Sequence, residues 1–387
     1  MKILLVGGGS GGHITPLLAV ASQLKKDKPN VQVAVITERL GVFNHLFDDA
    51  DQIDSLYFIN AGKFRRYHGE ALHRKIFDIR TILLNIRDAF KLMVGTAESI
   101  WALMRIRPDV AFIKGGYVGV PVGLACRLFR TPYITHDSDA VPGLTNRIIG
   151  KGARYNAVGM PPDNYSYKKE KMVYVGVPVT DDFIDPEPSI RKSKRSELDL
   201  KKDDLLLLIT GGSNGARRMD KIIHDCLEKI LDKNPKLNIV HQVGKNNENI
   251  YEDYPLKLHS RIRVASFLQP LSSYVAAADI VIARAGATAI AEIGHMKKPL
   301  ILVPNPYLTG AHQIKNAKVL QKLNAVLVID EHKALEDSSL VSKAIYDLIK
   351  KPDLRNDLEE KLYSLTQKDA TKKISNLLLK VIGENAG

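Results

Sequence analysis

Short apolar runs alternate with longer segments of helical periodicity along most of this chain. Residues 2–8, 31–37 and 109–116 each hold an apolar run of strand length, and the first and third of these runs end in glycines. Residues 15–26 place apolar side chains at helical spacing, and Pro16 fits the first turn of a helix. Strands that alternate with helices in this way predict βα units around a parallel sheet.

The same pattern ends and begins again once. Residues 160–172 are rich in proline and polar residues, and a new strand, glycine turn and helix begin at residue 205. The chain is therefore predicted to be an α/β protein with two doubly wound, Rossmann-like domains. We place the domains at residues 1–165 and 170–365, followed by a terminal helix over 366–387.

Composition limits the functions open to this chain. The formal net charge of +13 favours an anionic partner, which could be a nucleic acid, a phosphorylated metabolite or an anionic membrane surface. A merely well-solvated basic surface is the alternative. Aromatic residues make up 6% of the chain, which argues against a base-stacking platform and so against nucleic acid. Two distant cysteines and the lack of an apolar run of ~18 residues predict a reduced, cytoplasmic compartment and no membrane-spanning helix.

A glycine loop at residues 211–215 opens the second domain, between an apolar strand and a helix. Backbone N–H groups and the positive end of the helix can bind an anion there. Ser213 adds a hydroxyl donor, and Arg217 and Arg218 add positive charge. The loop lacks the Lys-Ser/Thr ending of a nucleoside-triphosphatase P-loop. A tight turn with only packing value is the alternative.

A second strand–turn–helix unit in this domain has related features. Ala287 and Thr288 give its helix a small first turn that exposes N–H groups to an anion. Glu292 could accept hydrogen bonds from both ribose hydroxyls of a nucleoside, or it could simply stabilise the helix dipole. Gln313 and Asn316 lie three residues apart on one helix face, where their amides can bind sugar hydroxyls.

The first domain opens on the pattern G-x-G-x-x-G from Gly7, and Glu38 ends its second strand, as in a dinucleotide site. His13, directly after the last glycine, has no task in such a site but could act as a general base. Because the stronger nucleotide features lie in the second domain, we predict that this loop holds the other reactant. Glu38 is then incidental. The glycine stretch at residues 114–121 would complete a crevice for a second phosphorylated ligand.

Two further stretches carry candidate chemistry. Residues 136–147 contain D-x-D, which binds a divalent metal in some sugar-nucleotide enzymes, but without further ligands we predict no metal. His136 and Asn146 could line the crevice. Residues 62–94 begin with basic residues and continue with an apolar stripe that suits an anionic membrane surface, or else the core. The stripe consists of Ile76, Phe77, Ile79, Ile82, Leu83, Ile86 and Phe90.

Six blocks in this order resemble the MurG family of peripheral membrane glycosyltransferases, which have the GT-B fold and make lipid II. They are GGGSGGHITP, GGYVGVP, HDSDAVPGLTNR, GGSNGAR, RAGATAIAE and the Gln313/Asn316 pair. The resemblance implies two domains facing a central cleft, with helix 366–387 packed back on the first. It implies inverting transfer of N-acetylglucosamine from UDP-N-acetylglucosamine to undecaprenyl-diphosphoryl-MurNAc-pentapeptide. It further implies that no metal or other cofactor is needed and that the enzyme works on the anionic cytoplasmic face of the membrane.

The resemblance also implies roles for individual residues. His13 is the candidate general base, Glu292 would bind the ribose, and Phe267 and Leu268 would border the uracil. The residues implied in donor binding are Gly212, Ser213, Asn214, Phe267, Leu268, Ala287, Thr288, Glu292, Gln313, Asn316 and Asp139. The residues implied in acceptor binding are Ser10, Gly11, Gly12, Gly115, Gly116, Tyr117, Asn146, Arg65 and Arg66.

The chain departs from the family pattern at three places. The family's H-E-Q-N is H-D-S-D here, so Asp139 stands where a neutral amide is expected. At two other positions, Thr180 replaces an arginine and Asn214 replaces a common glutamine. Three alternatives stay open. They are a GT-B glycosyltransferase with another lipid acceptor, an NAD(P)-dependent oxidoreductase built on the first glycine loop and Glu38, and a basic surface-binding protein without turnover.

Overall fold

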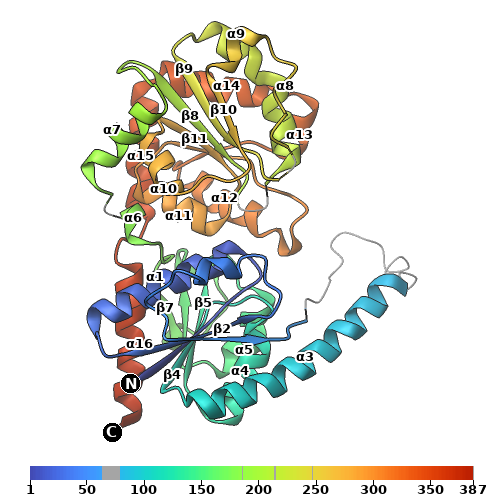
Figure 1. Ribbon diagram of the computed structural model, residues 1–387, viewed down its shortest axis with the longest axis vertical. Helices are drawn as coiled ribbons and strands as arrows, with labels where there is room; N and C mark the ends of the chain where they lie inside the picture. The colour runs from blue at the N-terminus through green and yellow to red at the C-terminus, as the bar shows by residue number, and fades with distance from the viewer. Residues whose placement is uncertain (63–78, 185, 213–214, 246, 387) are drawn as a thin grey trace. The chain divides into compact units, whose positions relative to one another are not determined.

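The structure is a computed structural model, and it divides the chain into two compact units. The described residues are 1–62, 79–184, 186–212, 215–245 and 247–386 (Figure 1). The first unit comprises residues 1–180 and 369–387, and the second comprises residues 181–368. Each unit is built on a parallel sheet with helices between its strands, which confirms the predicted α/β class with two doubly wound domains.

In its described residues the first unit holds a seven-stranded parallel sheet, ordered β3-β2-β1-β4-β5-β6-β7. The strands are β1 (Lys2–Val6), β2 (Gln32–Glu38), β3 (Ser55–Ile59), β4 (Val110–Ile113), β5 (Tyr133–Asp137), β6 (Tyr155–Val158) and β7 (Met172–Tyr174). Leu4 of β1 lies opposite Ala34 of β2 and Ala111 of β4. The strand order therefore reverses between β1 and β4, the point where ligands bind in doubly wound sheets. β7 lies beyond residue 165, where the sequence pattern ended the first domain.

Helices cover both faces of this sheet (Figure 1). The helices are α1 (Gly11–Asp27), α3 (Ile79–Ile106), α4 (Gly119–Leu128), α5 (Leu144–Ile149) and α16 (Ala370–Ala386), with 3-10 turns at Asn44–Phe47, Gly150–Gly152, Pro162–Asn164 and Lys169–Lys171. Ile3 and Leu5 of β1 pack with α1 and α16, whereas Leu4 and Val6 pack with α3, α4 and α5. This follows from the alternation of side chains along a strand.

The last helix belongs to the first unit. Ile374 and Leu378 of α16 are fully buried in the core that α1 also lines. Ser375 Oγ donates a hydrogen bond of 2.6 Å to Asp27 Oδ2 at the end of α1, and Lys372 forms an ion pair with the same carboxylate. Within the described ranges, no helix combines the length and the apolar content that crossing a membrane requires.

The described part of the second unit holds a six-stranded parallel sheet, ordered β10-β9-β8-β11-β12-β13. The strands are β8 (Leu205–Thr210), β9 (Leu237–Gln242), β10 (Ile262–Ala265), β11 (Ile280–Ala283), β12 (Leu300–Leu302) and β13 (Leu327–Val328). Here the order reverses between β8 and β11, where Thr210 lies opposite Ala283. The loops that follow these two strands thus begin side by side.

Helices also lie between the strands of the second unit. They are α6 (Asp181–Ile184), α7 (Pro188–Glu197), α8 (Arg217–Lys233), α9 (Leu256–His259), α10 (Leu271–Ala277), α11 (Ala287–His295), α12 (His312–Lys322), α13 (Glu331–Glu336), α14 (Ser339–Lys350) and α15 (Pro352–Leu365), with a 3-10 turn at Thr309–Ala311.

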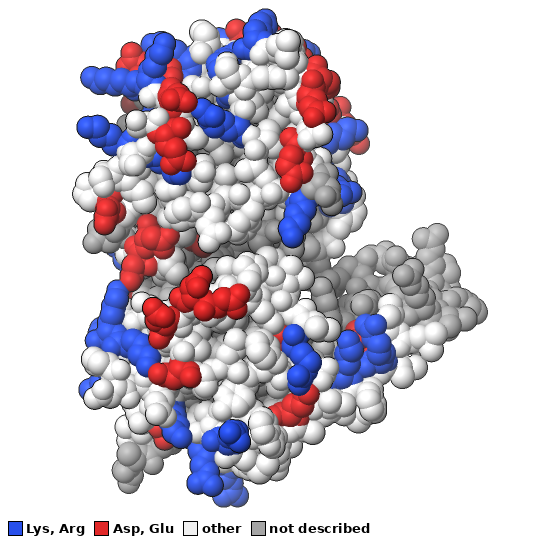
Figure 2. Space-filling view, viewed as in Figure 1, with Lys and Arg blue, Asp and Glu red and all other residues white. Residues whose placement is uncertain are grey.

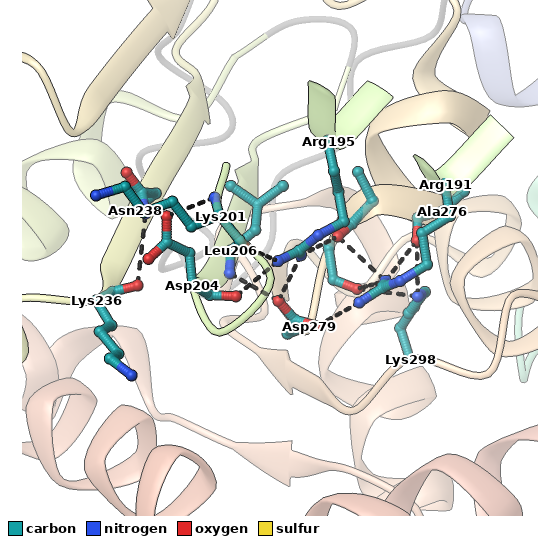
Figure 3. Close-up of polar contacts among 12 residues, drawn as sticks. Arg191, Arg195, Lys201, Asp204, Leu206, Lys236, Asn238, Ala276, Asp279 and Lys298 are labelled. Atoms are coloured by element: carbon teal, nitrogen blue, oxygen red, sulfur yellow. Dashed lines mark hydrogen bonds and ion pairs between the residues drawn. The ribbon is translucent and has the colours of Figure 1, made fainter. Parts of the chain in front are cut away.

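A charged clamp joins α7 to the start of β11. Arg191 and Arg195 of α7 both pair with Asp279, at 2.6 and 3.0 Å (Figure 3). Arg191 Nη1 and Lys298 Nζ also donate to the carbonyl of Ala276 at the end of α10. The clamp thereby holds the residue that precedes β11.

Candidate functional site

The loop between β1 and α1 brings His13 close to the cap of its own helix. Ser10 is the N-cap residue of α1, and His13 lies in the first turn. Ser10 Oγ and His13 Nδ1 are 3.0 Å apart. When Nδ1 donates its proton to this hydroxyl, the basic lone pair of the ring lies on Nε2, which is the tautomer that a general base requires.

Glu38 braces this loop, which corrects the prediction that it is an incidental residue. Its carboxylate accepts a hydrogen bond of 2.7 Å from the Gly9 backbone N–H and one of 3.1 Å from Thr37 Oγ1. Gly9 has φ +87°, which favours glycine, and a Cβ on Gly8 would collide with the Glu38 carboxylate. The acidic residue that suggested a dinucleotide site therefore fixes the backbone of the loop.

The loop after β4 touches the loop after β1. Gly115 and Gly116 have φ values of +105° and +72°, and Thr145 Oγ1 of α5 donates to the Gly116 carbonyl at 2.6 Å. A Cβ on Gly116 would lie 2.8 Å from the Gly8 carbonyl oxygen and 3.6 Å from His13 Nδ1. The structure thus brings His13 and both glycine loops together at the reversal of strand order.

Tyr117 closes one side of this group. A Cβ on Gly9 would lie 2.7 Å from its ring atom Cε1. Burial, and then the Glu38 carboxylate, raise the pKa of Tyr117 to about 12. The phenol therefore keeps its proton at neutral pH and donates it in a hydrogen bond to the Glu38 carboxylate. Gly11 is buried in the first turn of α1, and Gly12 is exposed.

Buried polar side chains lie beside the loop after β4, where a Cβ on Gly115 would lie 3.5 Å from Asn146 Nδ2. Asn146 Nδ2 donates to the His136 carbonyl and to Asp137 Oδ1, both at 2.9 Å. His136 is fully buried, its Nε2 lies 2.9 Å from the Gly176 carbonyl, and burial lowers its pKa well below the usual range. His136 is therefore neutral. Asn146 Oδ1 and His136 Nδ1 have no hydrogen-bond partner among the described residues.

Asp139, which is implied in donor binding, lies in the first unit after β5. Its side chain is half-buried, and its carbonyl accepts a hydrogen bond of 2.7 Å from Tyr165 Oη. Asp137, the other carboxylate of the D-x-D pattern, is buried and accepts hydrogen bonds from Tyr167 Oη and the Gly143 N–H. Among the described residues, no group of three His, Cys, Asp or Glu side chains is arranged to hold a metal ion.

In the second unit, two open glycine positions lie at the reversal of strand order. Gly212 follows β8 with φ +77°, and Gly286 is the N-cap residue of α11 after β11. A Cβ on either glycine would meet nothing within 4 Å. Because Thr210 and Ala283 are paired, both openings lie at the carboxyl ends of neighbouring strands. Backbone N–H groups there can bind an anionic ligand.

Glu292 lies in the second turn of α11 and is half-buried. Burial, and then the charge of Asp182, raise the pKa of its carboxyl to about 8. Ala287 is buried in the first turn of this helix, and Thr288 is half-buried. A poorly hydrated carboxyl beside an open helix end can form hydrogen bonds with the hydroxyl groups of a ligand.

Several predicted donor residues have tasks within the unit itself. Gln313 Oε1 accepts a hydrogen bond of 2.8 Å from the Asn305 N–H, and the fully buried Asn316 donates at 3.0 Å to the Ala285 carbonyl. Both therefore fix loops at the site, and direct contact with a sugar stays a prediction. Phe267 is 49% exposed, whereas Leu268 is buried.

Arg218 has partners within its own unit. Its guanidinium donates to Glu331 and Asn305, at 2.9 and 3.0 Å, and lies over the ring of Tyr307. It is therefore bound within the unit, whereas Arg217 is exposed. Ser213 and Asn214, and the basic residues Arg65 and Arg66, lie outside the described residues.

Comparison with known proteins decides the family. The model of the glycosyltransferase family 28 N-terminal domain matches residues 3–157, and that of the C-terminal domain matches residues 206–376. The chain belongs to glycosyltransferase family 28. It is a glycosyltransferase of the GT-B fold, which confirms the resemblance and removes the oxidoreductase and the non-enzymatic alternatives.

Relatives in family 28 match along their whole length. The UDP-N-acetylglucosamine--N-acetylmuramyl-(pentapeptide) pyrophosphoryl-undecaprenol N-acetylglucosamine transferase of Clostridium kluyveri is 32% identical over 98% of this chain and 99% of its own. The enzyme of the same name from Borreliella burgdorferi is 29% identical over 99% of this chain and 97% of its own. The crystal structure of Acinetobacter baumannii MurG superposes with a TM-score of 0.71 at 25% identity, over 98% and 99% of the two chains.

Sequence reasoning missed two residues of this family 28 site. Glu38 was given no functional role, although its position at the end of β2 places it beside the loop after β1. Lys114 was only part of a quoted glycine stretch, yet it is buried and donates to Ser138 Oγ at 2.6 Å. A lysine at the end of an apolar strand was the signal that could have found it.

Proposed function

We propose that this family 28 enzyme transfers N-acetylglucosamine from UDP-N-acetylglucosamine to undecaprenyl-diphosphoryl-MurNAc-pentapeptide. The observation that carries the proposal is the match with transferases of that name along almost the whole chain. The geometry supports it, because each unit has a glycine loop at the reversal of its strand order. Two such loops suit two phosphorylated reactants.

The proposed reaction is a direct displacement. The 4-hydroxyl oxygen of the muramyl sugar attacks the anomeric carbon of the donor, its proton passes to His13 Nε2, and UDP leaves with the electron pair of the broken bond. Inversion at the anomeric carbon follows from a single displacement. The contact of Nδ1 with Ser10 Oγ supports the role of His13, because it can orient the ring and fix its tautomer.

UDP is proposed to bind in the second unit without a metal or other cofactor. The openings at Gly212 and Gly286 offer backbone N–H groups to the diphosphate, and the positive end of α11 stabilises the charge that develops on it. Glu292 would accept hydrogen bonds from the ribose hydroxyls, and Phe267 and Leu268 would border the uracil. Ser213, Asn214, Ala287, Thr288, Gln313, Asn316 and Asp139 are the further donor residues of the proposal.

The acceptor diphosphate is proposed to bind over the two glycine loops of the first unit. Positive φ values at Gly9, Gly115 and Gly116 give these loops the compact backbone that close approach to a phosphate requires. Tyr117 is a further member of the proposed acceptor set, and its phenol donates to Glu38 beside these loops. Ser10, Gly11, Gly12, Asn146, Arg65 and Arg66 complete the proposed acceptor set.

An exposed apolar stripe on α3 supports binding to the cytoplasmic face of a membrane. Leu83, Ile86, Phe90 and Met93 are each 60–63% exposed, so the core alternative does not hold for this part of the stripe. They recur at helical spacing, and Figure 2 shows basic side chains beside uncharged ones on this helix. An amphipathic helix with basic flanks binds anionic lipid surfaces.

A radiolabelled transfer assay tests the proposal. The chain is expected to move labelled N-acetylglucosamine onto a lipid-linked muramyl acceptor in the presence of a metal chelator. Transfer only to another lipid, such as a diacylglycerol, would assign a different acceptor. UDP-N-acetylglucosamine is also expected to raise the melting temperature, whereas NAD is not.

A further inference from the structure

The strongest unassigned feature is a buried lysine among acidic residues of the first unit. Lys114 follows β4 directly and is 3% exposed. Its Nζ donates a hydrogen bond of 2.6 Å to Ser138 Oγ. A buried ammonium is strongly disfavoured unless acidic groups offset the loss of hydration, and the two carboxylates that act on it are Asp139 and Asp137.

We propose that Lys114 is the cation of the Asp137–Ser138–Asp139 segment and a positioning residue for the acceptor pocket. The inference rests on the proposed function, because that function places the acceptor diphosphate over the neighbouring glycine loops. In this role Lys114 touches no reacting atom. It holds Ser138 and offsets the negative charge of both carboxylates.

The surroundings of the two carboxylates support this role. Asp137 accepts hydrogen bonds from Tyr167 Oη at 2.6 Å and from the Gly143 N–H and Asn146 Nδ2 at 2.9 Å. These three donors are neutral, so they satisfy the oxygens without cancelling the charge. The charge of the Lys114 ammonium acts on Asp137 and favours its ionised form.

The group adjoins both glycine loops. The Lys114 N–H donates to the Val6 carbonyl at 2.8 Å, and a Cβ on Gly7 would lie 3.4 Å from the Lys114 Cβ. Gly115 follows Lys114 in the chain, and a Cβ there would lie 3.5 Å from Asn146 Nδ2. Loss of the ammonium would leave two carboxylates beside a pocket for a diphosphate, and their repulsion would weaken acceptor binding.

The proposal also accounts for the D-x-D pattern. In sugar-nucleotide enzymes that bind a divalent metal, the ion neutralises the two carboxylates. Here an ammonium from the same unit does so. It further accounts for Asp139, which stands where the family pattern has a neutral amide, because a carboxylate is tolerated beside a cation.

The charge of Lys114 depends on pH. The ionisable groups that face it are Asp137 and the neutral His136 on β5 and Asp139 after β5, while His13 of α1 acts on His136. Burial lowers the pKa of Lys114 to about 8. Its ammonium is therefore lost as the pH rises through about 8, and the KM for the acceptor is expected to rise over the same interval.

Four proteins test the proposal: the wild type, K114M, D139N and K114M/D139N. Methionine has nearly the same volume as lysine, so K114M removes the charge while the packing is kept. K114M is expected to raise the KM for the lipid-linked acceptor about tenfold and to abolish the pH dependence near pH 8. Adding D139N to K114M is expected to return the acceptor KM most of the way to the wild-type value, because the charges of Lys114 and Asp139 are coupled.

Two results would overturn the inference. One is an unchanged acceptor KM in K114M. The other is a loss of kcat and melting temperature in K114M that D139N does not relieve, since that pattern marks a structural role. If the wild type transfers nothing, the proposed function is wrong instead. The melting temperatures of the four proteins then still test whether the charges of Lys114 and Asp139 are coupled. Additive changes in melting temperature would exclude that coupling.

Discussion

At the scale of single residues, His13 combines a helix-capping partner with a place between two glycine loops. Replacement by alanine is expected to lower kcat by about 10²–10⁴-fold, because general-base catalysis contributes a factor of this size. The affinity for UDP is expected to stay nearly unchanged, since the openings at Gly212 and Gly286, which are proposed to bind the diphosphate of UDP, lie in the second unit. Initial rates and UDP titrations measure the two effects.

His45 provides a matched control for this substitution. It is an exposed histidine of the same unit, and its ring contacts the Val42 carbonyl in a surface turn. His45→Ala is expected to keep the wild-type rate. Equal rates for His13→Ala and wild type would remove His13 from the mechanism.

Glu292 makes the stability of the second unit depend on pH. Its pKa of about 8 lies above the ordinary value of 4.5, so the folded chain holds a proton that the unfolded chain has released between these values. The free energy of unfolding therefore falls as the pH rises through this interval. Glu292→Gln is expected to raise the melting temperature relative to the wild type at pH 8.5 and to change it less at pH 5.

The exposed Glu336 offers the comparison for Glu292. Glu336→Gln is expected to give the same difference from the wild type at both pH values. A parallel pH dependence in wild type and Glu292→Gln, followed by differential scanning fluorimetry, would contradict the assignment.

Single residues also show where the sequence is insufficient. His13 could be singled out because a histidine has no task in a dinucleotide loop. The partners of Glu38 and Lys114 could not, because they depend on the approach of loops far apart in sequence. Gly9 lies 29 residues from Glu38, and Ser138 lies 24 residues from Lys114. The partner of Arg218 could not be predicted for the same reason, since Glu331 lies 113 residues away.

At the scale of elements, the clamp between α7 and the start of β11 is a test of stability. Asp279 binds two arginines and accepts a hydrogen bond of 2.8 Å from the Leu206 N–H. Asp279→Ala leaves both guanidinium groups without this partner and is expected to cost about 2–4 kcal/mol of unfolding free energy. Urea denaturation followed by circular dichroism measures this change.

A surface ion pair of the same unit is the control for the clamp. Lys236 and Asp203 lie 3.6 Å apart, with 67% and 74% of their side chains exposed. Asp203→Ala is expected to change the unfolding free energy by less than about 0.5 kcal/mol. Similar losses in both variants would mean that the clamp has no special part in stability.

The elements themselves were largely predictable, because strand and helix periodicities differ. The apolar runs at residues 2–8, 31–37 and 109–116 all contain strands. β7 was missed because its three half-buried residues follow a polar stretch, so pairing with β6 rather than local pattern defines it. For α3 the apolar periodicity was clear, but the sequence could not decide between core and surface, since both give the same stripe.

At the scale of the whole molecule, the net charge of +13 and the stripe on α3 predict electrostatic and apolar binding to membranes. Ile86→Asp and Phe90→Asp are each expected to weaken binding to vesicles with anionic lipids by tenfold or more. The reason is that burial of one large apolar side chain contributes about 1.5–3 kcal/mol. Vesicle cosedimentation measures the affinity, and high salt is expected to weaken it further.

The melting temperature separates this effect from unfolding. Ile86→Asp and Phe90→Asp are expected to melt as the wild type does, because both side chains are exposed. Leu103→Asp, which alters a buried residue of the same helix, is expected to melt far lower. Undiminished binding to anionic vesicles by both surface variants would contradict the membrane proposal.

The return of α16 to the first unit has a consequence for biosynthesis. Ile374 and Leu378 fill a core that α1 also lines, although the ribosome makes the two helices more than 340 residues apart. The nascent first unit thus has one uncovered apolar face while the entire second unit is being synthesised. At about 5–20 residues per second, this interval lasts roughly ten seconds or more. During that time the unfinished chain is open to aggregation and to capture by chaperones.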